Sequence, residues 1–110
     1  MNLAQAFAAS VEKNPAKIAL FWGDEQYSYE RLFRAAVSTS LKLQQEHSVQ
    51  KQDRVGVWLK NCPEFVPAVF GVLMTGAVLV PINSFFKPDE VSHILRDAGI
   101  RVLIADASTL

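Results

Sequence analysis

The spacing of hydrophobic residues near the N-terminus predicts a short amphipathic helix. Within residues 2–13 an apolar side chain stands at every fourth position, which places three of them on one helical face: Leu3, Phe7 and Val11. The helix should end at Asn14, because a residue that precedes proline is pushed out of the α region.

Two short strands are expected next. Residues 18–22 form an apolar run, and the Gly23-Asp24 dipeptide that follows is typical of tight turns. Residues 26–28 come directly after this turn, so the two segments should pair as a β-hairpin.

A long helix should begin after Ser28. The Ser28 side chain can cap the helix, and Glu30 lies in the first turn, where negative charge suits the helix dipole. Apolar and small residues then recur at helical spacing: Tyr29, Leu32, Phe33, Ala36, Val37, Ser40, and either Leu43 or Leu41. The helix should extend to about Glu46 with its polar face in solvent.

From residue 54 onward the pattern alternates between strand and helix. Largely apolar strands are predicted at 54–59, 77–82 and 101–105, and the helices between them begin near Asn61 and at Pro88. Apolar strands that are separated by helices favour a parallel sheet covered on both faces. The predicted fold class is therefore α/β, with helices around a largely parallel sheet and an N-terminal β-hairpin.

Particular residues should define the ends of these later helices. Asn61 and Glu64 are three positions apart, which predicts an N-cap with a capping-box partner. Gly76 and Gly99 are expected to stop the two helices. After the last strand, Asp106-Ala107-Ser108 could begin one more helix.

The run from Phe65 to Ile82 raises the alternative of a membrane span. It contains no charged residue over eighteen positions, which is long enough for a transmembrane helix. Gly76 divides the run into a helix-like half and a β-branched half that continue the strand–helix alternation. We therefore predict a helix followed by a strand, and no transmembrane segment.

Composition narrows the possible functions. The 110 residues include eleven basic and eleven acidic side chains, and the scattered basic residues argue against binding of nucleic acid. The lone cysteine, Cys62, can form no internal disulfide and no cysteine-based metal site, which favours a reducing, cytoplasmic location. The N-terminal segment lacks the basic start of a signal peptide.

Few residues offer candidate chemistry. His47 and His93 lie on different predicted helices without a ligand cluster, so we expect both to be structural or solvated. Asp89-Glu90 should complement a helix dipole, and Cys62 is not expected to be reactive although a helix N-terminus can lower a thiol pKa. Asn83-Ser84-Phe85-Phe86 follows the carboxyl end of a strand, where α/β sheets bind ligands, yet adjacent phenylalanines favour packing.

Three stretches resemble the adenylate-forming superfamily of acyl-CoA synthetases, luciferases and peptide-synthetase adenylation domains. Residues 27–32 are similar to the early motif Thr/Ser-Tyr-x-Glu-Leu, with Arg31 in place of the usual Glu. Residues 53–65 are similar to the run Gly-Asp-Arg-Val … Asn-x-Pro-Glu, with Gln52 in place of Gly. Residues 71–83 match the pattern Leu-x-x-Gly-Ala-x-x-Val-Pro-Ile-Asn at every anchor.

The resemblance covers Leu3 to Ile104 and implies that residues 1–110 are an incomplete N-terminal part of an AMP-binding synthetase domain. The short loops and the Asn-Cys-Pro-Glu run are closer to the acyl-CoA synthetase and ligase branch than to peptide synthetases. For the full-length parent the resemblance implies an AMP-forming acid–thiol ligase of fatty acid metabolism, with ATP, Mg and CoA.

The family motifs present in these residues are scaffold. The family's phosphate loop ending in Pro-Lys, its Tyr-Gly-x-Thr-Glu motif and its C-terminal lysine have no counterpart among them. We therefore assign no catalytic, cofactor-binding or metal residue, and we expect the chain to be inactive alone.

Two hypotheses of function stay open. The first is a scaffold fragment whose partner is the remainder of the parent enzyme, and the second is a stand-alone, non-catalytic α/β module that binds a partner protein. If the chain is a fragment, its sheet would normally continue into later strands, so a sheet edge and apolar surface should be uncovered. We expect a homo-oligomer or a domain swap that buries about 1,200 Å² or more.

Overall fold

The computed structural model of the chain describes residues 2–106, and the predicted elements appear there in the predicted order. They are α1 (Leu3–Lys13), β1 (Ile18–Trp22), β2 (Glu25–Ser28), α2 (Tyr29–His47), β3 (Arg54–Trp58), α3 (Phe65–Met74), β4 (Val78–Pro81), α4 (Pro88–Asp97) and β5 (Val102–Ala105). The possible further helix at 106–108 falls on residues that, apart from Asp106, lie outside the described part of the chain.

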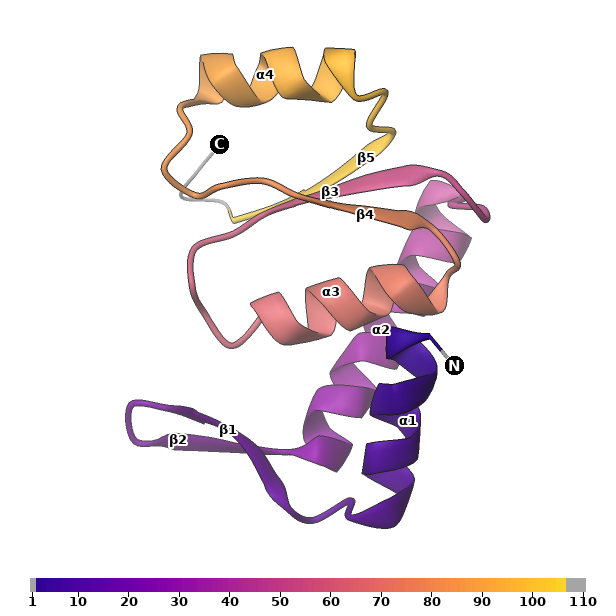
Figure 1. Cartoon of the computed structure of the whole chain (residues 1–110), viewed down its shortest axis with the longest axis vertical. Coiled ribbons are helices and arrows are strands. Elements are labelled where there is room, and N and C mark those ends of the chain that lie inside the picture. The colour runs from indigo at the N-terminus through magenta and orange to yellow at the C-terminus, as the bar shows by residue number, and fades with distance from the viewer. Residues whose placement is uncertain (1, 107–110) are drawn as a thin grey trace.

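The elements are stacked in layers around a three-stranded sheet (Figure 1). The strand order is β4-β3-β5, and both pairs are parallel. Helix α4 covers one face of the sheet, α3 covers the other, and α1 and α2 lie beyond α3 (Figure 1). The predicted α/β fold, with a parallel sheet covered on both faces, is confirmed.

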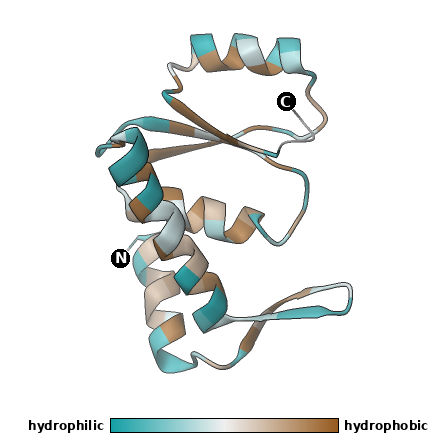
Figure 2. Ribbon diagram, turned by 180° about the vertical axis from the view of Figure 1, so that it is seen from behind, coloured by the Kyte–Doolittle hydropathy of each residue, from teal (hydrophilic) through white to brown (hydrophobic). Residues whose placement is uncertain are grey.

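The N-terminal hairpin and its flanking helices form as the local sequence predicts. β1 and β2 pair antiparallel around Gly23, whose φ of 58° is a left-handed value that glycine adopts without strain. The Ser28 Oγ accepts a hydrogen bond from the Arg31 N–H at 3.1 Å, so the predicted N-cap of α2 is confirmed. The hairpin extends away from the rest of the molecule, and part of it is brown in Figure 2, which marks hydrophobic residues.

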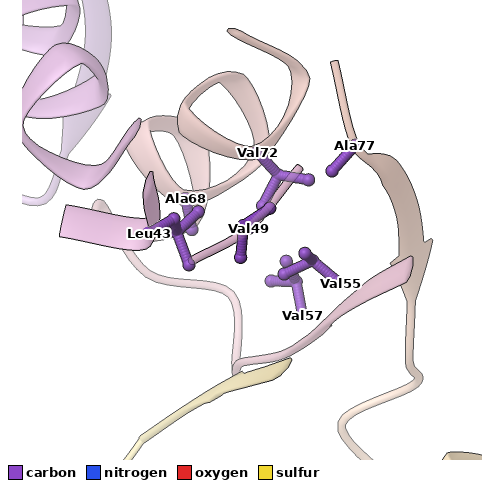
Figure 3. Packing of buried hydrophobic residues seen from close by; sticks show 7 residues of the cluster. All are labelled: Leu43, Val49, Val55, Val57, Ala68, Val72 and Ala77. Atoms are coloured by element: carbon purple, nitrogen blue, oxygen red, sulfur yellow. The ribbon is translucent and has the colours of Figure 1, made fainter. Parts of the chain in front are cut away.

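The main core lies between the sheet and α3. Val55 and Val57 of β3 and Val72 of α3 have no exposed surface, and they pack with Leu43, Val49, Ala68 and Ala77 (Figure 3). Burying a valine completely stabilises a fold by roughly 1.5–3 kcal/mol. This cluster therefore anchors α3, and through it α2, to the sheet.

Two further clusters explain why α3 and the strands are apolar on more than one side. On the far side of α3, Phe70 stacks on Phe7 of α1 with ring centroids 4.2 Å apart, beside Val11, Leu32 and Ala36. On the other face of the sheet, Val91 of α4 packs in a buried cluster with Trp58 and Ile82. Helix α3 is sandwiched between the sheet and the N-terminal helices, so it needs no polar face.

The eighteen-residue apolar run divides at Gly76, as predicted. Gly76 has a φ of 82° and separates α3 from β4. Within residues 2–106, no helix is both long and apolar enough to cross a membrane.

The predicted start of α3 is wrong. The helix begins at Phe65 rather than near Asn61, and Glu64 precedes it in a helical conformation with no side-chain capping bond. Asn61 and Cys62 lie in a bend, and the Phe65 N–H donates to the Cys62 carbonyl at 3.1 Å. These residues turn the chain from the end of β3 back under the sheet, so Asn61 is not placed to cap the helix.

Candidate functional site

The carboxyl ends of the three parallel strands lie along the same side of the sheet, which we call its carboxyl edge. A hollow of about 530 Å³ lies there. It is enclosed by α2, by the segment that leads into α3 and by the end of β5. Its lining residues are Ala35, Thr39, Leu59, Cys62, Glu64, Pro67, Ala68, Ile104, Ala105 and Asp106. Ligands of open α/β sheets bind outside the carboxyl ends of the strands, so this is the first place to look for a site.

Two smaller hollows continue the first one. A hollow of about 200 Å³ shares Ala35, Glu64 and Pro67 with it and leads to Tyr27 and Arg31 at the hairpin. A hollow of about 330 Å³ shares Leu59 and lies beside the loop after β4, with Asn61, Phe65, Pro81, Ile82, Asn83 and Ser84. We call the three together the carboxyl-edge groove.

The polar side chains of the groove are largely engaged within the chain. The Thr39 hydroxyl donates to the Ala35 carbonyl at 3.0 Å. The Asn83 side-chain oxygen accepts from the Phe85 N–H at 2.9 Å, and the Phe86 N–H donates to the Asn83 carbonyl at 3.1 Å. Asn83 therefore closes a turn and holds the loop in place.

Cys62 is a free thiol at the wall of the groove. Burial raises its pKa, and the Glu64 carboxylate raises it further as a hydrogen-bond partner and as a negative charge. The backbone N–H groups of Glu64 and Phe65 act in the opposite direction and are outweighed. The raised pKa favours the protonated thiol and so argues against a thiolate activated by a helix N-terminus, and the low reactivity of Cys62 stays a prediction.

Phe85 and Phe86 are the candidate contact residues that the sequence singled out at this edge. Phe85 is 90% exposed and Phe86 is 37% exposed. An isolated exposed phenylalanine is ordinary, but these two stand beside the groove, so apolar side chains and an apolar hollow occur together.

The remaining residues that the sequence singled out are His47, His93 and Asp89-Glu90, and they do not line the groove. His47 ends α2 and is exposed, and His93 on α4 is exposed with its Nε2 3.3 Å from the Asp97 carboxylate. The Lys87 N–H donates to the Glu90 carboxylate at 2.9 Å, so Glu90 caps α4. Both histidine side chains are therefore exposed, as expected, and their lack of a metal or catalytic role stays a prediction.

The opposite, amino edge of the sheet is held by polar contacts that the sequence did not indicate. Arg101 donates to the Ser48 carbonyl at 2.7 Å and to the Asp53 carboxylate at 2.8 Å, and the Gln50 N–H donates to Asp53 at 2.8 Å. The Gln50 N–H and then Arg101 lower the pKa of the Asp53 carboxyl. Arg101 is about fifty residues from both of its partners, Ser48 and Asp53, and no local pattern predicts such pairing.

Among the described residues, the groove carries few side chains of the kinds that bind metal ions or phosphate groups. Within residues 2–106, no three His, Cys, Asp or Glu side chains lie close enough together to hold a metal ion. The groove holds two carboxylates, from Glu64 and Asp106, and no glycine-rich loop lies along it.

Known proteins of one family match almost the whole chain. The family described as "AMP-binding enzyme" matches residues 7–110. A long-chain-fatty-acid–CoA ligase of Bacillus subtilis is 33% identical over 103 residues, and gramicidin S synthase 2 of Brevibacillus brevis is 28% identical over 104 residues. Each of these alignments covers 94% of this chain.

A solved structure shares the fold. The N-terminal subdomain of NpsA from Klebsiella oxytoca, in complex with 3-hydroxyanthranilyl-AMSN, superposes with a TM-score of 0.87 at 25% identity over 96% of this chain and 27% of that one. The chain spans only 18% of the length of the ligase and 2% of that of the synthase.

Proposed function

Since the chain belongs to the AMP-binding enzyme family, as its N-terminal part, we propose that it is scaffold of an ATP-dependent carboxylate–CoA ligase. Such an enzyme joins a carboxylate to the AMP part of ATP with release of pyrophosphate, and then transfers the acyl group to the thiol of CoA with release of AMP. The main support for the proposal is the family match over residues 7–110. The chain spans only 18% of the length of the fatty-acid ligase, so it corresponds to a small part of such an enzyme.

The choice of the ligase branch rests on finer features. Of the two relatives named above, the fatty-acid ligase shares 33% of aligned residues and the peptide synthase 28%. The turn at Asn61-Cys62-Pro63-Glu64, which resembles the ligase motif, forms the wall between two hollows of the groove. ATP, Mg and CoA belong to this proposal for the parent enzyme, as does a cytoplasmic location.

We expect the 110-residue chain to have no adenylation activity. The experiment measures ATP–pyrophosphate exchange with a panel of fatty and aromatic carboxylates, using the chain alone and the product of any longer reading frame that encodes it. Exchange by the longer product and none by the chain supports the scaffold role. Exchange by the chain alone would overturn it.

A chimera tests the branch. The segment of the Bacillus subtilis ligase that aligns with residues 7–110 is replaced by this chain, and in a second chimera the matching segment of a gramicidin S synthase adenylation domain is replaced. We expect the ligase chimera to retain acyl-CoA formation, because its remaining surfaces should fit the carboxyl-edge groove. Activity in the synthase chimera only would assign the chain to the peptide-synthetase branch.

The stand-alone interaction module is the second candidate. It is favoured by exposed aromatic residues at two separated places, Phe21 at 66% and Phe85 at 90% exposure. The DNA that follows the codon of Leu110 separates the two candidates. An immediate stop codon supports the module, and a continuing frame with a Pro-Lys-ending loop supports the scaffold.

A further inference from the structure

Helix α4 and strand β5 are attached to the rest of the chain at few points. Among the described residues, the segment 83–100 makes backbone hydrogen bonds only within itself, and β5 joins the sheet through its pairing with β3. Figure 1 shows α4 as a layer of its own above the sheet, with a connecting segment at each end. Side chains and the β3–β5 pairing therefore hold this part of the fold in place.

Helix α4 is buried much less than α3. Val91 is the buried residue of α4, Ile94 and Leu95 are half-buried, and the other residues of the helix, which are mostly polar, are exposed. By contrast, every residue of α3 is buried or half-buried. Because burial of apolar surface is the main stabilising contribution, α4 should separate from the sheet more easily than α3 does.

The layer beneath α4 also contains a buried hydrogen-bond donor without an acceptor. The Trp58 side chain is 4% exposed and packs in one cluster with Val91, and its Nε1–H has no partner among the described residues. A buried N–H without an acceptor has lost its hydrogen bond to water, which destabilises the closed packing. Separation of α4 from the sheet would restore that bond.

Two arginine side chains close this part of the fold at the amino edge of the sheet. Arg101 donates to the Ser48 carbonyl at 2.7 Å and to the Asp53 carboxylate at 2.8 Å, and Arg54 donates to the Ala98 carbonyl at 2.5 Å. Arg101 therefore joins the start of β5 to the segment between α2 and β3. The Arg101–Asp53 contact is charged on both sides, and charge-assisted hydrogen bonds are roughly twice as strong as neutral ones.

We propose that residues 83–105 open from the sheet as one unit, with Arg101 as its latch, while α2, α3 and β3 stay packed. Both ends of this unit line the carboxyl-edge groove, one through the loop after β4 and the other through the end of β5. Opening therefore changes the walls of the groove. A contact at the amino edge thus controls the shape of the groove at the opposite edge, and this inference does not depend on the catalytic proposal.

Hydrogen exchange of the unmodified chain tests whether the unit exists. Peptides from α4, β5 and α3 are compared by mass spectrometry under native conditions, after correction for intrinsic exchange rates. We expect amides of α4 and β5 to be less protected than those of α3 by about tenfold or more, because they exchange through opening of the unit. Equal protection of the three elements would overturn the proposal.

Two matched cysteines separate opening of the unit from unfolding of the whole chain. In a Cys62→Ser background, Val91→Cys places a buried thiol under α4, and Val72→Cys places one between α3 and the sheet. Leu32 packs among α1, α2 and α3, so Leu32→Val should raise the labelling rate at position 72 about fivefold and leave the rate at position 91 unchanged. An equal rise at both positions would overturn the proposal, because the chain would then open only as a whole.

The latch is tested by labelling at position 91. Arg101→Met removes the donors to Ser48 and Asp53, and it should raise the labelling rate there about tenfold. The rate at position 72 should rise with it, because the latch is broken both in the open unit and in the unfolded chain. Arg96→Met removes an exposed arginine of α4 and should leave both rates unchanged. An Arg101→Met variant that is labelled no faster than its parent at position 91 would show that Arg101 is not the latch.

Discussion

Gly71 of α3 packs directly against Thr39 and Ala36 of α2, and replacing it with alanine tests this packing. A Cβ atom at this position would lie 2.7 Å from both the Cβ and the Cγ2 of Thr39 and 3.0 Å from the Ala36 carbonyl. Real Cβ atoms essentially never come this close to a neighbour. The Thr39 Cβ is fixed to the backbone of α2, so rotation of the side chain cannot relieve the overlap and the helices must separate.

Two effects of opposite sign determine the result. Alanine in place of glycine inside a helix stabilises it by about 0.5–1 kcal/mol. Overpacking of a tight interior contact costs about 1–3 kcal/mol. We therefore expect Gly71→Ala to lower the free energy of unfolding by about 1 kcal/mol, although alanine is the better helix former.

A double-mutant cycle isolates the contact. In a Thr39→Gly background the colliding side chain is gone, so Gly71→Ala should be neutral or stabilising, with a coupling energy of about 1–2 kcal/mol. Urea unfolding followed by tryptophan fluorescence provides the free energies, because Trp58 is buried in the fold. A Gly71→Ala variant that is more stable than the parent chain in both backgrounds would refute the reasoning.

Three further predictions concern a thiol, a carboxylate and a helix end. Glu64→Gln should lower the pKa of Cys62 and so increase the rate at which the thiol is alkylated at a fixed, mildly alkaline pH. The control Glu46→Gln, on the exposed side of α2, should leave that rate unchanged. Identical alkylation rates in the two variants would contradict the role assigned to Glu64. Asp53 has a lowered pKa in the folded state, so its contribution to stability is present above the unfolded pKa of about 3.9 and is lost as the pH falls through the folded pKa. Asp53→Asn should therefore reduce the Tm at pH 7 but not in acid below that folded pKa, and a reduction of equal size at both pH values would argue against the linkage. Gly76→Ala should lower the free energy of unfolding by about 1–2 kcal/mol, because the φ of 82° is a left-handed value. Gly76→Asn should lower it by less, because asparagine tolerates this conformation better than alanine. Equal stability of the two variants in urea unfolding would show that the backbone conformation is not the cause.

The sequence predicted the elements well because their signals are local. The apolar stripe of α1, the Ser28 cap of α2 and the stops at Gly76 and Gly99 each depend on residues within a turn or two of one another. The α3 start was the exception. Asn61 and Glu64 have the right types and spacing for a capping box, but the chain uses these residues to turn out of β3.

The carboxyl-edge groove could be located only in part. The rule that α/β sheets bind at the carboxyl ends of strands pointed to Asn83-Ser84-Phe85-Phe86, and the third hollow does lie there. The larger hollow joins Thr39 of α2, Cys62 and Ala105. These three residues come from separate elements, and their meeting depends on how α2 crosses α3.

By itself, the sequence determined the fold class and the family, because both follow from short-range periodicity and from the run Gly76 to Asn83 that resembles one known pattern. Only the tertiary structure decided the strand order β4-β3-β5, the Arg101–Asp53 contact and the meeting of Thr39, Cys62 and Ala105 in one hollow. The physical reason is that these features depend on the distance between residues that are remote along the chain. Packing sets that distance, and no pattern of neighbouring residues encodes it.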